Sequence, residues 1–122
     1  MVFNAIDYRK KLSSLKSLRK GWDGYDAPEI NLESIDRSIA LLDMVNANCL
    51  AILKIEPSEE GGVNLFFEKD ENSTMGCSVG DNRMSYFIKY EGKAPVFSDF
   101  LEYSDKNLMF WKNQVNQFAE DE

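Results

Sequence analysis

Between Leu50 and Tyr90 the chain consists of short runs in which apolar residues alternate with other residues, and each run ends at a turn. This period of two predicts strands over residues 50–55, 63–68, 75–79 and 84–90. Gly80-Asp81-Asn82-Arg83 is a strong hairpin signal. No segment between the runs is long enough for the crossover helix that parallel strands require. The pattern therefore predicts an antiparallel meander, to which residues 96–98 add a short edge strand.

Apolar residues at helical spacing predict three helices around this sheet. They cover residues 5–20, residues 32–45 after an Asn31 cap, and a last segment that begins at Ser104 or Asp105. Helices at both ends of a run of strands predict an α+β fold. We expect two N-terminal helices and a C-terminal helix packed on a 3-5-stranded antiparallel sheet. With no linker or repeat in 122 residues, one domain over residues 1–122 is expected.

The segment Gly21-Trp22-Asp23-Gly24-Tyr25-Asp26-Ala27-Pro28 separates the first two helices. Its glycines and proline predict a structured loop. Trp22 and Tyr25 are expected to fold back onto the body, and Asp23 to accept backbone N–H groups of its own turn. The alternative is a binding loop, because an aromatic pair beside a carboxylate suits a base, a sugar or a basic side chain.

This segment resembles a motif in a family of small uncharacterised bacterial and phage-type proteins. In that family a Leu-rich helix ends in Gly-Trp-Asp-Gly-Tyr-x-Ala followed by Pro, and a later Pro-x-x-x-Gly-Gly-Val leads into a strand. Residues 57–65 match the second motif, and the resemblance spans residues 12–90. It implies a bacterial cytosolic setting, often on mobile elements, and it implies no catalytic residues. The chain departs from the family at Phe67-Glu68, where Glu-Trp is expected, and in its C-terminal helix.

The chain contains no histidine, which excludes Ser-His and Cys-His nucleophile pairs and imidazole metal ligands. Cys49 and Cys77 are too few for a zinc site and are expected to be free, buried thiols. Gly61-Gly62 lacks the Lys-Ser/Thr pair of a phosphate loop. We therefore expect no cofactor and no metal. Carboxylates are numerous enough for acid–base chemistry or a divalent cation. The favoured interpretation is that they keep the turns soluble; they are Glu59, Glu60, Glu68, Asp70 and Glu71.

Charge is unevenly spread along the chain. Residues 1–20 carry a net charge of +5 and the remainder −12, which together give −7. An acidic body repels nucleic acid and membrane phosphates. With no secretory signal and no apolar run of membrane length, we expect a cytoplasmic protein with no membrane contact. Arg9, Lys16 and Lys20 form a basic stripe on the first helix, which is expected to be solvated or docked on the acidic body; the alternative is contact with an anion or nucleic acid.

Aromatic residues of the strands and the last helix exceed what one small core hides. They are Phe66, Tyr86, Phe87, Tyr90, Phe110 and Trp111. The leading hypothesis is a non-enzymatic protein-interaction module, an accessory or antitoxin-like factor of a mobile element, whose acidic body masks a basic partner. A second copy, in a homodimer, is the other candidate partner.

The alternative function is a small-ligand-binding protein or enzyme with a pocket near Trp22 and Tyr25. A second alternative is anion or nucleic-acid contact through the first helix. The candidate binding residues are thus Trp22, Asp23, Tyr25, Phe110 and Trp111.

Overall fold

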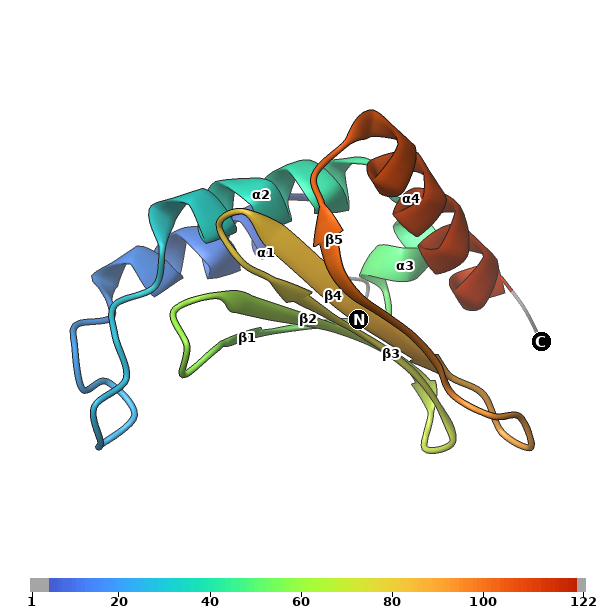
Figure 1. Cartoon of the computed structure of the whole chain (residues 1–122), viewed down its shortest axis with the longest axis horizontal. Coiled ribbons are helices and arrows are strands. Elements are labelled where there is room, and N and C mark those ends of the chain that lie inside the picture. Colours follow the sequence, from blue (N-terminus) through green and yellow to red (C-terminus); the bar gives the residue numbers. More distant parts are fainter. Residues whose placement is uncertain (1–4, 121–122) are drawn as a thin grey trace.

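The structure, a computed structural model, describes residues 5–120. A layer of helices covers one face of a curved antiparallel sheet (Figure 1). The strands are β1 (Leu53–Pro57), β2 (Val63–Asp70), β3 (Ser73–Val79), β4 (Arg83–Lys89) and β5 (Val96–Glu102). Their order in the sheet is their order in the chain, and each pairs antiparallel with its neighbour. The α+β class and the antiparallel meander are therefore confirmed.

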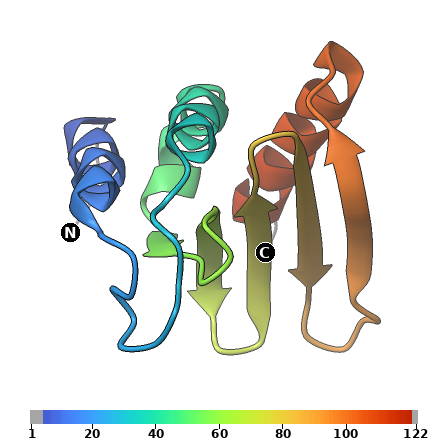
Figure 2. The same ribbon diagram turned by 60° about the vertical axis from the view of Figure 1, so that its left-hand side comes forward.

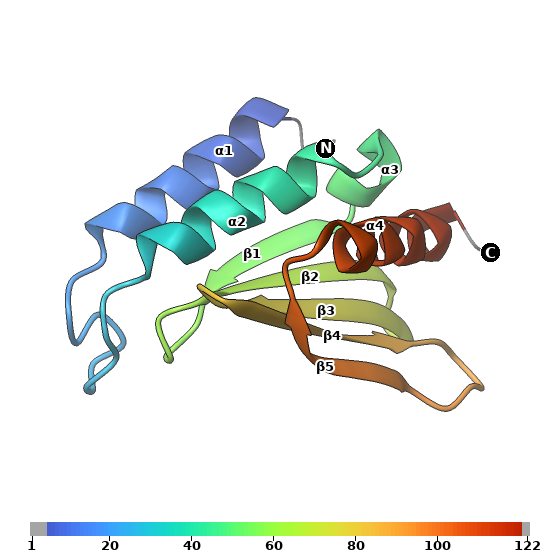
Figure 3. The same cartoon turned by 45° about the horizontal axis from the view of Figure 1, so that its top comes forward.

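The helical layer has one more α-helix than expected within the described residues. Its elements are α1 (Ala5–Ser14), the 3₁₀ turn η1 (Leu15–Ser17), α2 (Leu32–Asp43), the short α3 (Ala47–Leu50) and α4 (Asp105–Glu120). Helices α1 and α2 lie side by side, and α4 lies at the other end of the same layer (Figures 2 and 3). The Asn31 side chain caps α2 by accepting a hydrogen bond from the Glu33 N–H, with an N···O distance of 3.2 Å.

The core lies between the two layers. Strands β1 to β4 each send alternate side chains toward the helices, so one face of the sheet is buried. Helix α4 contributes three fully buried side chains on one side of the helix, namely Trp111, Val115 and Phe118. The largest fully buried side chains of the described core are Trp111, Phe67, Phe118, Leu12, Ile35, Leu41, Leu42, Leu65, Met75 and Met84.

The first helix is shorter than the expected range of residues 5–20. The α-helix ends at Ser14 and tightens into η1, and Leu18 is extended at φ −72° and ψ 126°. The hydroxyls of Ser14 and Ser17 donate to backbone carbonyl oxygens three residues earlier, at O···O distances of 2.6 and 2.8 Å. Such local bonds compete with a continuing helix, and the apolar spacing gave no sign of them.

Two strand boundaries also differ from expectation. Strand β1 begins at Leu53 and not at Leu50, because Leu50 ends the short helix α3. The Asn46 N–H holds the start of this helix by donating to the Asn116 side-chain oxygen of α4 at 3.0 Å, and Cys49 is buried. Strand β5 extends to Glu102, beyond the expected residues 96–98, because it pairs along the whole of β4 from Ile88 to Arg83.

Candidate functional site

The face of the sheet that carries no helix presents a row of aromatic side chains. Three phenylalanines on β2, β4 and β5 and a glycine on β3 are direct cross-strand partners, namely Phe66, Gly76, Phe87 and Phe97. We call these four residues the aromatic row. Phe66 and Phe87 are half-buried, whereas Phe97 is 67% exposed although its ring centroid lies 6.4 Å from that of Phe87. Exposed aromatic side chains on an uncovered face are typical of a binding surface.

Gly76 provides the space that the Phe87 ring occupies. A Cβ atom at Gly76 would lie 2.3 Å from Cε1 of Phe87, so the ring rests directly on the glycine backbone. A hollow of ≈ 290 Å³ lies beside the rings, and Asn64, Ser85 and Asp99 also line it. The aromatic row therefore combines apolar rings with a polar-sided depression.

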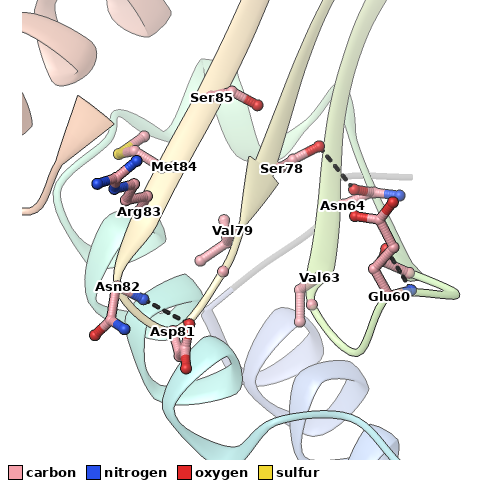
Figure 4. A pocket seen from close by; sticks show the side chains of 13 residues that line it. Glu60, Val63, Asn64, Ser78, Val79, Asp81, Asn82, Arg83, Met84 and Ser85 are labelled. Atoms are coloured by element: carbon pink, nitrogen blue, oxygen red, sulfur yellow. Dashed lines mark hydrogen bonds between the residues drawn. The ribbon is translucent and has the colours of Figure 1, made fainter. Parts of the chain in front are cut away.

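A second hollow, of ≈ 580 Å³, lies at the end of the sheet where the β1–β2 and β3–β4 turns approach each other (Figure 4). Ser78 Oγ donates to Asn64 Oδ1 across β2 and β3, at an O···O distance of 3.1 Å. Glu60, Asp81 and Arg83 supply the charged side chains of its lining. Both hollows are lined by Asn64, Ser78 and Ser85, so they form one continuous surface with the aromatic row, which we call the open face.

The structure separates the two candidate residues of the last helix. Trp111 is fully buried in the core. Phe110 is 54% exposed and lines a groove of ≈ 450 Å³ between α4 and β5, together with Tyr86 and Leu101. Adjacent helical residues point about 100° apart, which explains the difference. Trp111 is thus a packing residue, and Phe110 remains available at the surface.

The loop of residues 21–28 is held by its own hydrogen bonds. Asp23 Oδ1 accepts from the backbone N–H groups of Tyr25 at 2.9 Å and Ala27 at 3.3 Å. The Trp22 indole N–H donates to the Pro28 carbonyl at 2.8 Å, and its ring packs against the core. The expectation that Tyr25 folds back is wrong, because it is 83% exposed. Gly21, at φ 83°, lets the chain turn sharply enough for its N–H to reach the Ala27 carbonyl at 2.8 Å.

The loop that precedes α2 and the β1–β2 turn meet in space. The Asn31 N–H donates to the Gly61 carbonyl oxygen at 2.7 Å. Gly61 has φ 94°, and a Cβ atom there would lie 3.5 Å from Cγ of Pro28. The loop before α2 and the β1–β2 turn therefore form one joint. The three pockets described above are lined by other residues than Trp22 and Tyr25.

Replacing Asp23 with alanine is expected to lower the free energy of unfolding by about 1–3 kcal/mol. The change leaves two backbone N–H groups of the loop without their acceptor. Urea denaturation measures the loss. Asp26→Ala removes the same charge from an exposed position in the same loop and is expected to change stability by less than about 0.5 kcal/mol. Equal losses in the two variants would contradict the structural role of Asp23.

The basic stripe is partly engaged within the chain. Arg9 Nη2 lies 2.5 Å from Asp43 Oδ2 of α2, and the Tyr8 hydroxyl donates to the other oxygen of that carboxylate. The Asp43 carboxylate raises the pKa of Arg9, and burial, followed by the bond to Asp43, raises the pKa of Tyr8. Lys16 and Lys20 are exposed. Arg9 therefore joins the two N-terminal helices, and the stripe does not act as one free cationic group.

The candidate carboxylates do not assemble into a cluster among the residues that the structure describes. No group of three or more Asp, Glu or Cys side chains there is placed to hold a metal ion. Glu68 pairs with Lys54 at 3.6 Å, and Asp70 Oδ1 accepts from the Asn72 N–H in the β2–β3 turn at 2.8 Å. These two side chains stabilise the sheet and a turn.

Both thiols are free and buried, as expected. Burial raises the pKa of Cys77 to about 12 and that of Cys49 to about 11. Burial outweighs the neighbouring Trp111 indole N–H, which lowers the pKa of Cys77 although it makes no hydrogen bond within the usual distance. Raised pKa values make both thiols poor nucleophiles at neutral pH.

Stability is expected to fall as pH rises above about 9. The unfolded thiols ionise near their ordinary pKa of 9.0, whereas the folded thiols keep their protons until pH passes the raised values. The unfolded state then binds fewer protons, and Cys77 alone contributes a decline of up to about 1.4 kcal/mol per pH unit. Urea denaturation from about pH 8 to about pH 11 measures the slope. A Cys77→Ala variant with the wild-type slope would contradict this origin.

Sequence reasoning missed Phe97 as a surface residue. The expected edge strand of residues 96–98 includes Phe97. The sequence does not show which residue of the neighbouring strand lies opposite Phe97. The signal was present in the alternation, because Phe66 and Phe87 each alternate with the buried residues of their strands. Register between strands, which the alternation alone does not give, is what brings them into one row.

The fold and this surface define an α+β domain with one covered and one open sheet face. Comparison with protein-family models, curated proteins and solved structures finds no significant match to this chain. None of its described helices has both the length and the apolar character that a membrane crossing requires.

Proposed function

We propose that the protein is a non-enzymatic protein-interaction module that binds its partner on the open face. The observation that carries this proposal is the aromatic row, with Phe97 67% exposed on a sheet face without helices. Aromatic side chains are enriched among the residues that contribute most to binding between proteins. The hollows beside the row offer hydroxyl and amide groups for the polar part of such an interface.

The biological setting that we propose rests on the resemblance of residues 12–90 to the motifs described above. This resemblance supports a cytoplasmic accessory or antitoxin-like factor encoded on a mobile element. The largest pKa shifts belong to Cys77, Cys49 and Tyr103, and burial is the main cause of each. Of these side chains the two thiols are buried, and the Tyr103 hydroxyl donates to the backbone carbonyl oxygens of Gly80 and Arg83. They are structural groups and not parts of an open site.

The proposal is tested by using the full chain to capture its partner from the native host. We expect Phe97→Ser to reduce the recovery of a specific partner about tenfold or more, as for the central aromatic residues of protein interfaces. Tyr25→Ser is the matched control, because Tyr25 is an exposed aromatic residue outside the open face. Recovery that is unaffected by Phe97→Ser would overturn the proposal.

Light scattering of the wild-type chain tests whether the partner is a second copy. A dimer on the open face would show twice the monomer mass of 14.0 kDa and would return to the monomer mass in the Phe97→Ser variant. A dimer that persists in that variant would use another surface.

A further inference from the structure

The basic first helix lies on the covered side of the sheet, away from the open face. It belongs to the helical layer, where Arg9 is bound to Asp43 of α2. The open face lies on the opposite side of the sheet and belongs to the strands and turns of residues 53–103, which carry ten acidic and five basic side chains and a net charge of −5. The basic end of the sequence is therefore not placed to neutralise the open face.

Acidic side chains outnumber basic ones in the linings of the two hollows. The charged residues that line its two hollows are the acids Glu60, Asp81 and Asp99 and the single base Arg83. Lys54 shares a cross-strand position with Phe66, but its ammonium is already paired with Glu68 at 3.6 Å. Lys89 is a further base on this face, exposed and two residues from Phe87 along β4. Of the bases beside the row, Lys54 is thus paired with Glu68, and the two hollows hold three acids against Arg83.

The edges of the sheet disfavour binding by strand addition. Strand β5 carries Asp99 and Glu102 and a register shift opposite Met84–Tyr86, and charges and bulges are features that block pairing with a further strand. The other edge strand, β1, ends at Pro57, which has no N–H to donate. A partner segment would therefore lie on the face of the sheet.

The aromatic row matches one face of a short helix in length. It spans three gaps between strands of about 4.8 Å each, or about 14 Å. At a rise of 1.5 Å per residue, this is about ten residues of α-helix. A helix of this length with an apolar stripe would cover the rings and bring its flanking side chains over the bordering carboxylates.

We propose that the partner segment bound by the open face is a cationic amphipathic helix, with its apolar stripe on the aromatic row and its Lys or Arg side chains facing Asp81 and Asp99. This inference rests on the proposed function and specifies the chemistry of the partner. The carboxylates select the partner's charge, while the rings supply most of the binding energy.

The probe is a synthetic amidated peptide of about fifteen residues, long enough to form a helix, with Leu at helical spacing and Lys at the other positions. A second peptide has Glu in place of every Lys. Each is titrated into the isotope-labelled full chain, and backbone amide NMR shifts report both affinity and location. We expect the Lys peptide to shift amides of β2 to β5 and to bind at least about tenfold tighter than the Glu peptide.

Matched charge variants separate a local effect from an effect of net charge. Asp81→Asn with Asp99→Asn removes two charges from the open face and is expected to weaken the Lys peptide about tenfold. Asp26→Asn with Glu29→Gln removes two charges from the exposed loop before α2 and is expected to leave affinity within about twofold. Equal weakening by both pairs, or shifts confined to the helical layer, would overturn the inference.

The two proposals fail in different ways. If host partner recovery depends on Phe97 but the Lys and Glu peptides bind equally, the interaction module stands and the cationic helix is rejected. If recovery does not depend on Phe97, the proposed function itself is rejected. Raising salt from about 0.1 M to about 1 M shortens the screening length from about 10 Å to about 3 Å, and should weaken the Lys peptide. A salt-independent affinity would also count against the charge selection.

Discussion

Replacing Trp111 with alanine is expected to lower the free energy of unfolding by about 3–5 kcal/mol. Trp111 is the largest fully buried side chain of the described core, and its removal leaves a cavity beneath α4. Because domains of this size are stable by only about 5–15 kcal/mol, a large part of the total stability would be lost. Urea denaturation followed by circular dichroism measures the change.

The adjacent residue is the control for this prediction. Phe110→Ala removes a side chain that is 54% exposed and is expected to change stability by no more than about 1 kcal/mol. The two residues share a helix and similar aromatic character, so the contrast reports the orientation of α4. A loss in Phe110→Ala that equals the loss in Trp111→Ala would show that the helix presents a different face to the sheet.

Replacing Gly62 with alanine is expected to cost about 2–3 kcal/mol, although only one methyl group is added. The new Cβ atom would lie 2.7 Å from the carbonyl oxygen of Val79, a backbone atom that cannot rotate away. The β1–β2 turn would have to move, and that turn holds the Gly61 carbonyl that accepts from the Asn31 N–H. Thermal unfolding of the variant and the wild type measures the effect.

Gly92→Ala is the matched control for the turn. Gly92 has φ 75°, but no atom lies within 4 Å of the position of its Cβ, so alanine there adds only backbone strain. We expect a cost of about 1–2 kcal/mol for this variant. If Gly92→Ala proves as destabilising as Gly62→Ala, the close approach between the turn and Val79 is not the cause.

The meander could be predicted because its signals are local. Alternation marks which residues of β2, β3 and β4 face the core, and short turns between the runs leave only antiparallel neighbours. Helix α2 was equally clear from its apolar stripe and its Asn31 cap. These features depend on residues within one turn or one hairpin of each other.

The parts that were wrong depend on contacts between distant residues. Strand β1 begins three residues later than expected. The residues before it are held by α4, since Asn46 and Cys49 bond to a residue about seventy positions later in the chain. The size of the Tyr25 side chain predicts burial, but the loop directs it into solvent. No feature of the sequence indicates that direction. The aromatic row required the register between four strands, which is fixed only in the folded sheet.

The order of the strands has a consequence for folding kinetics. Since every strand pairs with the one before it, most of the sheet forms from contacts that are close in sequence, and such topologies fold quickly. The bond from the Asn46 N–H to Asn116 closes a much longer loop and fastens α4. We therefore expect the hairpins of β2, β3 and β4 to be formed in the transition state, and α4 to dock after it. In kinetic terms, substitutions at Val115 would mainly speed unfolding, whereas substitutions at Met75 would slow folding.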